Sequence, residues 1–152
     1  MTRAHFLILA ALGSATLLLG AIAFQTFGGL APCKMCIWQR WPHGIAMGIG
    51  VLALFTGIRH LPLLGALVVT IGAGIAFYHT GVELGWFEGP NSCTSGSIQG
   101  MSTEQLLDQI MNAPIVRCDE VAWSLFGLSM AAWNGILSLG IALLWFLGWR
   151  MG

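Results

Sequence analysis

Residues 31–40, APCKMCIWQR, separate two long apolar runs at about 6–27 and 37–58. Two cysteines, Cys33 and Cys36, lie in this short connection. An apolar run of roughly 20 residues is long enough to cross a bilayer as a helix. The stretch therefore predicts two membrane-spanning helices whose connection carries a pair of thiols.

Two more apolar runs, at about 61–82 and 126–149, raise the predicted number of spans to four. Only 8% of the 152 residues are charged, whereas a soluble domain carries about 25%. We expect an all-α membrane protein, a single four-transmembrane-helix bundle over residues 1–152. The first run could instead be a signal peptide, since Arg3 precedes it and AIA at 21–23 mimics a cleavage site, but its length favours a retained span. The net charge of zero and the lack of a basic stripe give no sign of nucleic-acid binding.

The four spans determine on which side of the membrane the connections lie. Because successive connections alternate sides, the loops at about 28–36 and 83–125 face the same compartment. Basic residues are divided evenly between the two sides, so the positive-inside rule does not orient the bundle. All four cysteines fall in these two loops, which suits an oxidising compartment where disulfides persist. We therefore place both loops outside the cytoplasm.

The second loop contains a short amphipathic segment, STEQLLDQIM, at residues 102–111. Ser102 can cap a helix there, and Gln105 can reach back to the cap. Its leucines, isoleucine and methionine share one face, and Pro114 is expected to end the helix. So short a helix needs a surface to bind. It either lies at the bilayer interface or packs onto the spans.

The C-x-x-C pair has the features of a reactive dithiol. At a helix start both sulfurs lie on one face, close enough to bridge, and the positive end of the helix dipole lowers a thiol pKa. Arg40 is one turn beyond Cys36 and would stabilise its thiolate. Its charge needs a partner, for which a thiolate, a quinone oxygen or a lipid headgroup would serve. Pro42 leaves two possibilities: a kinked helix that begins near Lys34, or a helix that begins at Pro42.

Alternative chemistries for the cysteines fit less well. A c-type haem is excluded in its usual form because Ile37 follows the pair. Zinc needs four ligands, and the spacing of Cys93 and Cys118 is unlike a zinc knuckle, so no metal is predicted. A bridge between Cys93 and Cys118 would stabilise the loop by roughly 3–4 kcal/mol. The Gly- and Ser-rich loop and the nearby dithiol favour disulfide exchange instead.

Aromatic residues mark both predicted membrane interfaces, and Gly44 and Gly48 have a spacing that permits close helix packing. Trp38 and Trp41 are also candidates to flank a bound quinone ring. The expected interface anchors on the cysteine side are Trp38, Trp41, Trp86, Phe87 and Trp123, and those on the other side are Trp145 and Trp149.

Three segments, in order, carry a resemblance to a known family. They are PCKMCIWQR after the first span, YHTGVELGWF at the end of the third, and RCDEVAWSLFGLSMAAWN entering the fourth. The chain resembles the disulfide bond formation protein B family, bacterial inner-membrane enzymes that reoxidise a periplasmic thioredoxin-fold thiol oxidase and reduce a membrane quinone. The chain departs from the family in having Gln39 where relatives often carry glutamate, and in its very short tails.

The resemblance implies a role for each site residue. Cys36 would adjoin the quinone ring, with Arg40 and His79 also at the quinone site. Cys93 would form a mixed disulfide with the oxidase. The quinone, ubiquinone or menaquinone, would receive the electrons, and the cysteine loops would face the periplasm. The implied catalytic residues are Cys33, Cys36, Cys93 and Cys118.

The sequence leaves two rival functions open. A vitamin K epoxide reductase-like quinone reductase also has four spans, but its C-x-x-C would fall late in the bundle. A non-catalytic four-span protein with two structural disulfides is the second rival.

Overall fold

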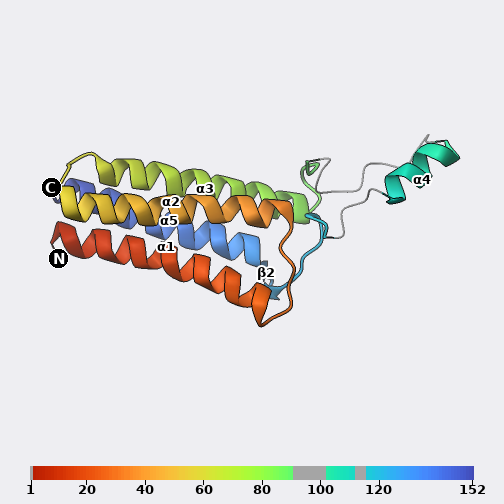
Figure 1. Cartoon of the computed structure of the whole chain (residues 1–152), viewed down its shortest axis with the longest axis horizontal. Helices are drawn as coiled ribbons and strands as arrows, with labels where there is room; N and C mark the ends of the chain where they lie inside the picture. Colours follow the sequence, from red (N-terminus) through yellow and green to blue (C-terminus); the bar gives the residue numbers. More distant parts are fainter. Residues whose placement is uncertain (1, 91–101, 112–115) are drawn as a thin grey trace.

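Four long helices form an up-and-down bundle in the computed structural model, which describes residues 2–90, 102–111 and 116–152 (Figure 1). Each helix packs against two neighbours, so that the order around the bundle is α1, α2, α3, α5. Short connections make successive helices antiparallel, as in other up-and-down bundles. The long helices are α1 (Arg3–Thr26), α2 (Lys34–Thr56), α3 (Leu61–Glu83) and α5 (Met130–Arg150).

The two ends of the bundle differ in what they carry. Both termini and the turn between α2 and α3 lie at one end, and the connection from α1 to α2 lies at the other (Figure 1). The end of α3 and the segment leading into α5 are also at this second end, which we call the cysteine end. It holds Cys33 and Cys36 at the start of α2, with Cys118 close to Cys33, whereas Cys93 lies outside the described residues. We expected the two cysteine-bearing loops to lie at the same end of the bundle, and three of the four cysteines are indeed found there.

Helix α2 begins at Lys34 and continues through Pro42. Of the two possible starts, the one near Lys34 is thus confirmed, and a start at Pro42 is wrong. Cys33 is the N-cap residue, and Gly57, with φ of 67°, ends the helix in the left-handed conformation that glycine adopts without strain. The helix start thus places the first cysteine of the pair at the cap and the second in the first turn.

The last long helix begins later than the predicted span at 126–149. Phe126 and Gly127 have φ of 52° and 77° and form a tight turn. That turn joins the antiparallel strands β1 (Ser124–Leu125) and β2 (Leu128–Ser129), a small hairpin that we did not predict. The Ser129 hydroxyl then caps α5 by accepting from the Ala132 N–H at 3.2 Å.

The bundle core is centred on Trp145, which is fully buried. A Cβ added at Gly65 would lie 2.7 Å from its indole, and one at Gly50 would lie 2.9 Å from Ala11. Close packing thus depends on these glycines. A Cβ added at Gly44 or Gly48 would meet nothing within 4 Å, so the close helix packing predicted for these two glycines is wrong within this chain. The interface role predicted for Trp145 is also wrong, because its side chain is buried in the core.

The outer surface of the bundle is apolar on all four long helices. One exposed side chain on each illustrates this: Leu19 (64% exposed), Phe55 (87%), Leu67 (57%) and Leu143 (56%). Soluble monomers rarely expose contiguous apolar patches of this kind. Within the described residues, α1, α3 and α5 are long and apolar enough to cross a membrane. The chain is therefore a helical membrane protein.

The short helix α4 (Thr103–Met111) lies beyond the cysteine end (Figure 1). Its predicted capping box is confirmed. The Ser102 N–H donates to Gln105 Oε1 at 3.0 Å, and the Gln105 N–H donates to the Ser102 hydroxyl at 3.3 Å. The expected end at Pro114 lies outside the described residues, and the location at the bilayer interface stays a prediction.

Candidate functional site

The thiols of Cys33 and Cys36 lie side by side at the start of α2. Their sulfurs are 2.7 Å apart, and both cysteines are free. The Cys33 sulfur also accepts a hydrogen bond from the Cys36 N–H at 3.1 Å, as a cap residue does. The predicted approach of the two sulfurs is confirmed, and oxidation would join them with little movement of the backbone.

The surroundings activate one of the two thiols. Cys36 lies in the first turn of α2, ahead of the apolar run that begins at Ile37. The hydrogen bond from the Cys33 thiol lowers the pKa of Cys36 to about 7, although burial and the negative charge of Glu83 oppose this. The charge of Arg40 lowers the pKa only slightly further. The same hydrogen bond raises the pKa of Cys33. Cys36 is therefore the more reactive thiol at neutral pH, because the thiolate is the nucleophile.

This pKa predicts how alkylation depends on pH. In the reduced protein, the rate of Cys36 modification by iodoacetamide should rise through a midpoint near pH 7, because a lowered pKa keeps the thiolate populated at lower pH. Replacing Cys33 by Ala removes the hydrogen bond and should move the midpoint toward the ordinary value of about 8.5. Mass spectrometry of the peptide that contains Cys36 gives the rates. An unchanged midpoint in the variant would contradict this cause.

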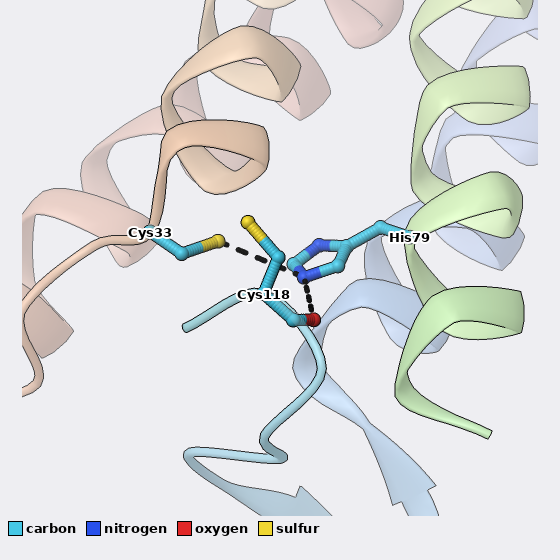
Figure 2. A group of neighbouring side chains, drawn as sticks. All are labelled: Cys33, His79 and Cys118. Atoms are coloured by element: carbon cyan, nitrogen blue, oxygen red, sulfur yellow. Dashed lines mark hydrogen bonds between the residues drawn. The ribbon is translucent and has the colours of Figure 1, made fainter. Parts of the chain in front are cut away.

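Cys118 comes to the same place from a distant part of the chain (Figure 2). The sulfurs of Cys33 and Cys118 and a ring nitrogen of His79 all lie within 4.8 Å of one another. His79 Nε2 lies 3.6 Å from the Cys33 sulfur and donates to the Cys118 carbonyl at 3.1 Å. Cys118 is in a disulfide, whereas Cys33 is free. A reducible bond and a thiol thus meet across the two loops.

The hydrogen bonds of His79 favour sulfur exchange over metal binding at this cluster. The Gln39 amide nitrogen donates to the Met35 carbonyl at 3.2 Å and to His79 Nδ1 at 2.8 Å. Nδ1 is therefore the acceptor, and the hydrogen of the neutral ring is on Nε2. A nitrogen that carries a hydrogen cannot bind a metal, and the sulfur of Cys118 is already bonded.

A cavity of about 410 Å³ lies beside the dithiol, between the long helices. Such a volume is typical of small-molecule sites. From α2, Cys36, Arg40 and His43 line it at a spacing of one helical turn, and His79 lines it from α3. Neither Trp38 nor Trp41 is among the described lining residues, whereas Trp123 and Trp133 are, so a ring bound in this cavity would adjoin the latter two. Its apolar lining includes Leu17, Phe24, Leu30, Met130 and Leu137.

Arg40 is held by α1 and still presents a donor without a partner. Its guanidinium donates to Gln25 Oε1 at 2.7 Å and to the Ala21 carbonyl at 3.4 Å. Its Nε is buried with no hydrogen-bond partner among the described residues. Gln25 is not among the three partners that the sequence suggests for this charge. A lone amide near the end of the first apolar run was the only signal in the sequence.

Four polar side chains form a connected path inside the bundle, which we call the inner polar chain: Gln39, His43, His79 and Asn134. Beyond the bond from Gln39 to His79, the Asn134 amide donates to Gln39 Oε1 at 2.7 Å. His43 Nε2 lies 3.1 Å from Asn134 Oδ1. Of these four, only His79 was assigned to the site from the sequence.

Comparison with known proteins identifies the family. The sequence model described as "Disulfide bond formation protein DsbB" matches residues 3–148. Disulfide bond formation protein B of Methylococcus capsulatus is 33% identical over 89% of this chain and 87% of its own length. Its counterpart from Stutzerimonas stutzeri is 27% identical over 91% of this chain and 90% of its own length. An uncharacterized protein of Rickettsia prowazekii is 31% identical over 77% of this chain and 69% of its own length. No solved structure is significantly similar. The chain therefore belongs to the disulfide bond formation protein B family.

Proposed function

We propose that this protein is a thiol:quinone oxidoreductase of the bacterial inner membrane. It reoxidises a periplasmic thioredoxin-fold thiol oxidase and passes the electrons to a membrane quinone. The observation that carries the proposal is the position of Cys36, whose activated thiol lines a largely apolar cavity while its partner Cys33 adjoins Cys118. In this proposal Cys36 would reduce a lipid-soluble acceptor, and Cys33 would exchange with a second disulfide.

The cavity suits a quinone as the electron acceptor. Its walls are largely apolar, and the unpartnered Arg40 Nε is a donor for a carbonyl oxygen. His79 lines the same cavity. A quinone bound there would take up two electrons and two protons. Both ubiquinone and menaquinone meet these requirements, because the polar contacts are to the ring oxygens and not to the features that differ between them.

Sulfur exchange would carry the electrons to this cavity. A thiolate of the reduced oxidase attacks Cys93 in the Cys93–Cys118 disulfide, and the oxidase leaves with its own disulfide. The Cys118 thiolate then attacks Cys33 in the Cys33–Cys36 disulfide, and the position of their sulfurs within 4.8 Å of each other supports this step. Each exchange breaks one sulfur–sulfur bond and forms one. Cys36 is released as the thiolate beside the cavity.

The proposed orientation in the membrane rests on the cysteines that lie at one end of the bundle. Exposed apolar side chains on all four long helices support four spans, with α2 as the span that carries polar residues inward. The cysteine end would face the periplasm, and α4 would lie at the bilayer interface near the docking site of the oxidase. The whole chain would act as one membrane domain.

Turnover with both substrates tests the proposal. Purified protein in detergent, a reduced periplasmic thioredoxin-fold oxidase and a short-chain quinone should together consume quinone, followed by its ultraviolet absorbance. Omission of either protein should stop the reaction. A protein with two purely structural disulfides would leave the quinone absorbance unchanged, which would contradict the proposal.

A further inference from the structure

The inner end of the cavity contains a second buried atom that lacks a partner. His43 lines the cavity, and its side chain is 3% exposed. Its Nδ1 has no hydrogen-bond partner among the described residues. Leaving a buried polar atom unsatisfied costs free energy, so such an atom in a native protein calls for an explanation. A hydrogen bond from a ligand hydroxyl to this atom is one such explanation, because His43 lines the cavity.

The inner polar chain determines the hydrogen-bonding character of this atom. The Asn134 amide nitrogen donates to Gln39, so its oxygen faces His43 and accepts from Nε2. The buried Ser138 hydroxyl lies 3.4 Å from the same nitrogen. In neutral His43 the hydrogen is therefore on Nε2, and Nδ1 is a lone-pair acceptor. A second proton on the ring would place another cation one turn from Arg40 in apolar surroundings, which is costly.

The two unpartnered atoms therefore differ in what they can bind. Arg40 Nε is a donor, and His43 Nδ1 is an acceptor. They belong to residues three positions apart on α2, about 4.5 Å of helical rise. A quinone has two carbonyl oxygens, which only accept, so it would satisfy Arg40 alone. A quinol has two hydroxyls, which both donate and accept, so it would satisfy both atoms.

We propose that His43, held in its tautomer by Asn134, binds a hydroxyl of the reduced ring and makes the cavity selective for quinol over quinone. The inference rests on the proposed quinone site. Overall, two thiols and a quinone give a disulfide and a quinol, and both hydrogens come from the thiols. A site that binds the product more tightly shifts the bound equilibrium toward quinol by the ratio of the two affinities. His43 thereby favours the flow of electrons away from sulfur.

Equilibrium binding to the Cys33→Ser, Cys36→Ser double variant, with and without the change at His43, tests this without turnover, because no cysteine among the described residues then lines the cavity to exchange electrons with either ligand. The dissociation constants of a short-chain ubiquinone and its quinol are measured by quenching of tryptophan fluorescence. Replacing His43 by Phe keeps an aromatic ring but removes the acceptor. We expect quinol affinity to fall about tenfold, the value of one hydrogen bond, and quinone affinity to change by less than about twofold. His60→Phe, at the opposite end of the bundle, is the matched control.

A second variant keeps the inference testable if His43→Phe does not fold. Asn134→Leu leaves His43 in place but removes the oxygen that fixes its tautomer. This variant should weaken quinol binding but not quinone binding, by a smaller factor than His43→Phe. The Ser138 hydroxyl can still accept a hydrogen bond from His43 Nε2. Equal losses for both ligands, or no loss for either, would overturn the inference. A double variant with His43 intact that binds neither ligand would instead contradict the proposed quinone site itself.

Discussion

Replacing Cys33 by Ala is expected to reduce quinone turnover at least about a thousand-fold, as the loss of a nucleophile does in other enzymes. Cys33 is within reach of both Cys36 and Cys118, because its sulfur lies 2.7 Å from the first and within 4.8 Å of the second. Without it, neither the exchange between loops nor the oxidation of Cys36 to a disulfide can take place. The initial rate of quinone loss in the presence of reduced oxidase gives the activity.

Protein abundance distinguishes this result from a structural defect. Cys33 is free and makes its contacts at the helix cap, so the variant should accumulate in the membrane at close to the wild-type amount. Cys33→Ser is a useful companion, because it retains a capping oxygen but no redox chemistry, and it should be as inactive as the alanine variant. Activity that fell only in proportion to abundance would show that the cysteine is structural.

Replacing Trp145 by Ala is expected to lower the free energy of unfolding by about 3–5 kcal/mol, the range measured for such truncations in cores. Trp145 is fully buried, and its indole fills the space that Gly50 and Gly65 leave between α2, α3 and α5. Because lipid is as apolar as the core, the loss comes mainly from packing and the cavity left behind. Unfolding in mixed micelles with increasing denaturing detergent, followed by circular dichroism, gives the free energy.

Trp145→Phe is the matched control for this prediction. It retains most of the ring volume and removes an indole N–H that has no hydrogen-bond partner among the described residues. We expect its stability to be within about 1 kcal/mol of wild type, because the lost contacts are offset by the removal of an unsatisfied donor. Trp145 does not line the described cavity, so both variants should keep their activity per folded molecule. Equal destabilisation by Ala and Phe would contradict the packing explanation.

Local patterns predicted much of the fold. Apolar runs located the long helices, and the Ser102–Gln105 capping box was evident because all its members lie within four residues. The C-x-x-C spacing predicted that the two sulfurs would lie close together, but Pro42 left the start of α2 open between Lys34 and Pro42. The hairpin before α5 was missed, because Phe126 adopts a positive φ that non-glycine residues seldom take.

The cavity shows where the sequence was insufficient. Arg40 was singled out because a charge in an apolar run is conspicuous, but its partner Gln25 is on another helix. The same holds for Asn134, which contacts Gln39 and His43 from a position more than 90 residues away. Which helices become neighbours is decided by packing across the whole bundle. Trp145 illustrates the same limit, because its place in a segment rich in interfacial aromatics suggested the membrane surface, and only the glycines of α2 and α3 place it in the core.

The number of quinone molecules that one fully reduced chain converts tests the account most directly. Four cysteines hold two electron pairs. Anaerobic mixing of the reduced protein with excess short-chain quinone should therefore consume two equivalents in wild type and one in Cys118→Ser. The Cys33→Ser, Cys36→Ser double variant should consume none, which controls for direct oxidation of the outer pair. A wild-type value of one would contradict exchange between the loops, and a value of zero would contradict transfer from sulfur to quinone altogether.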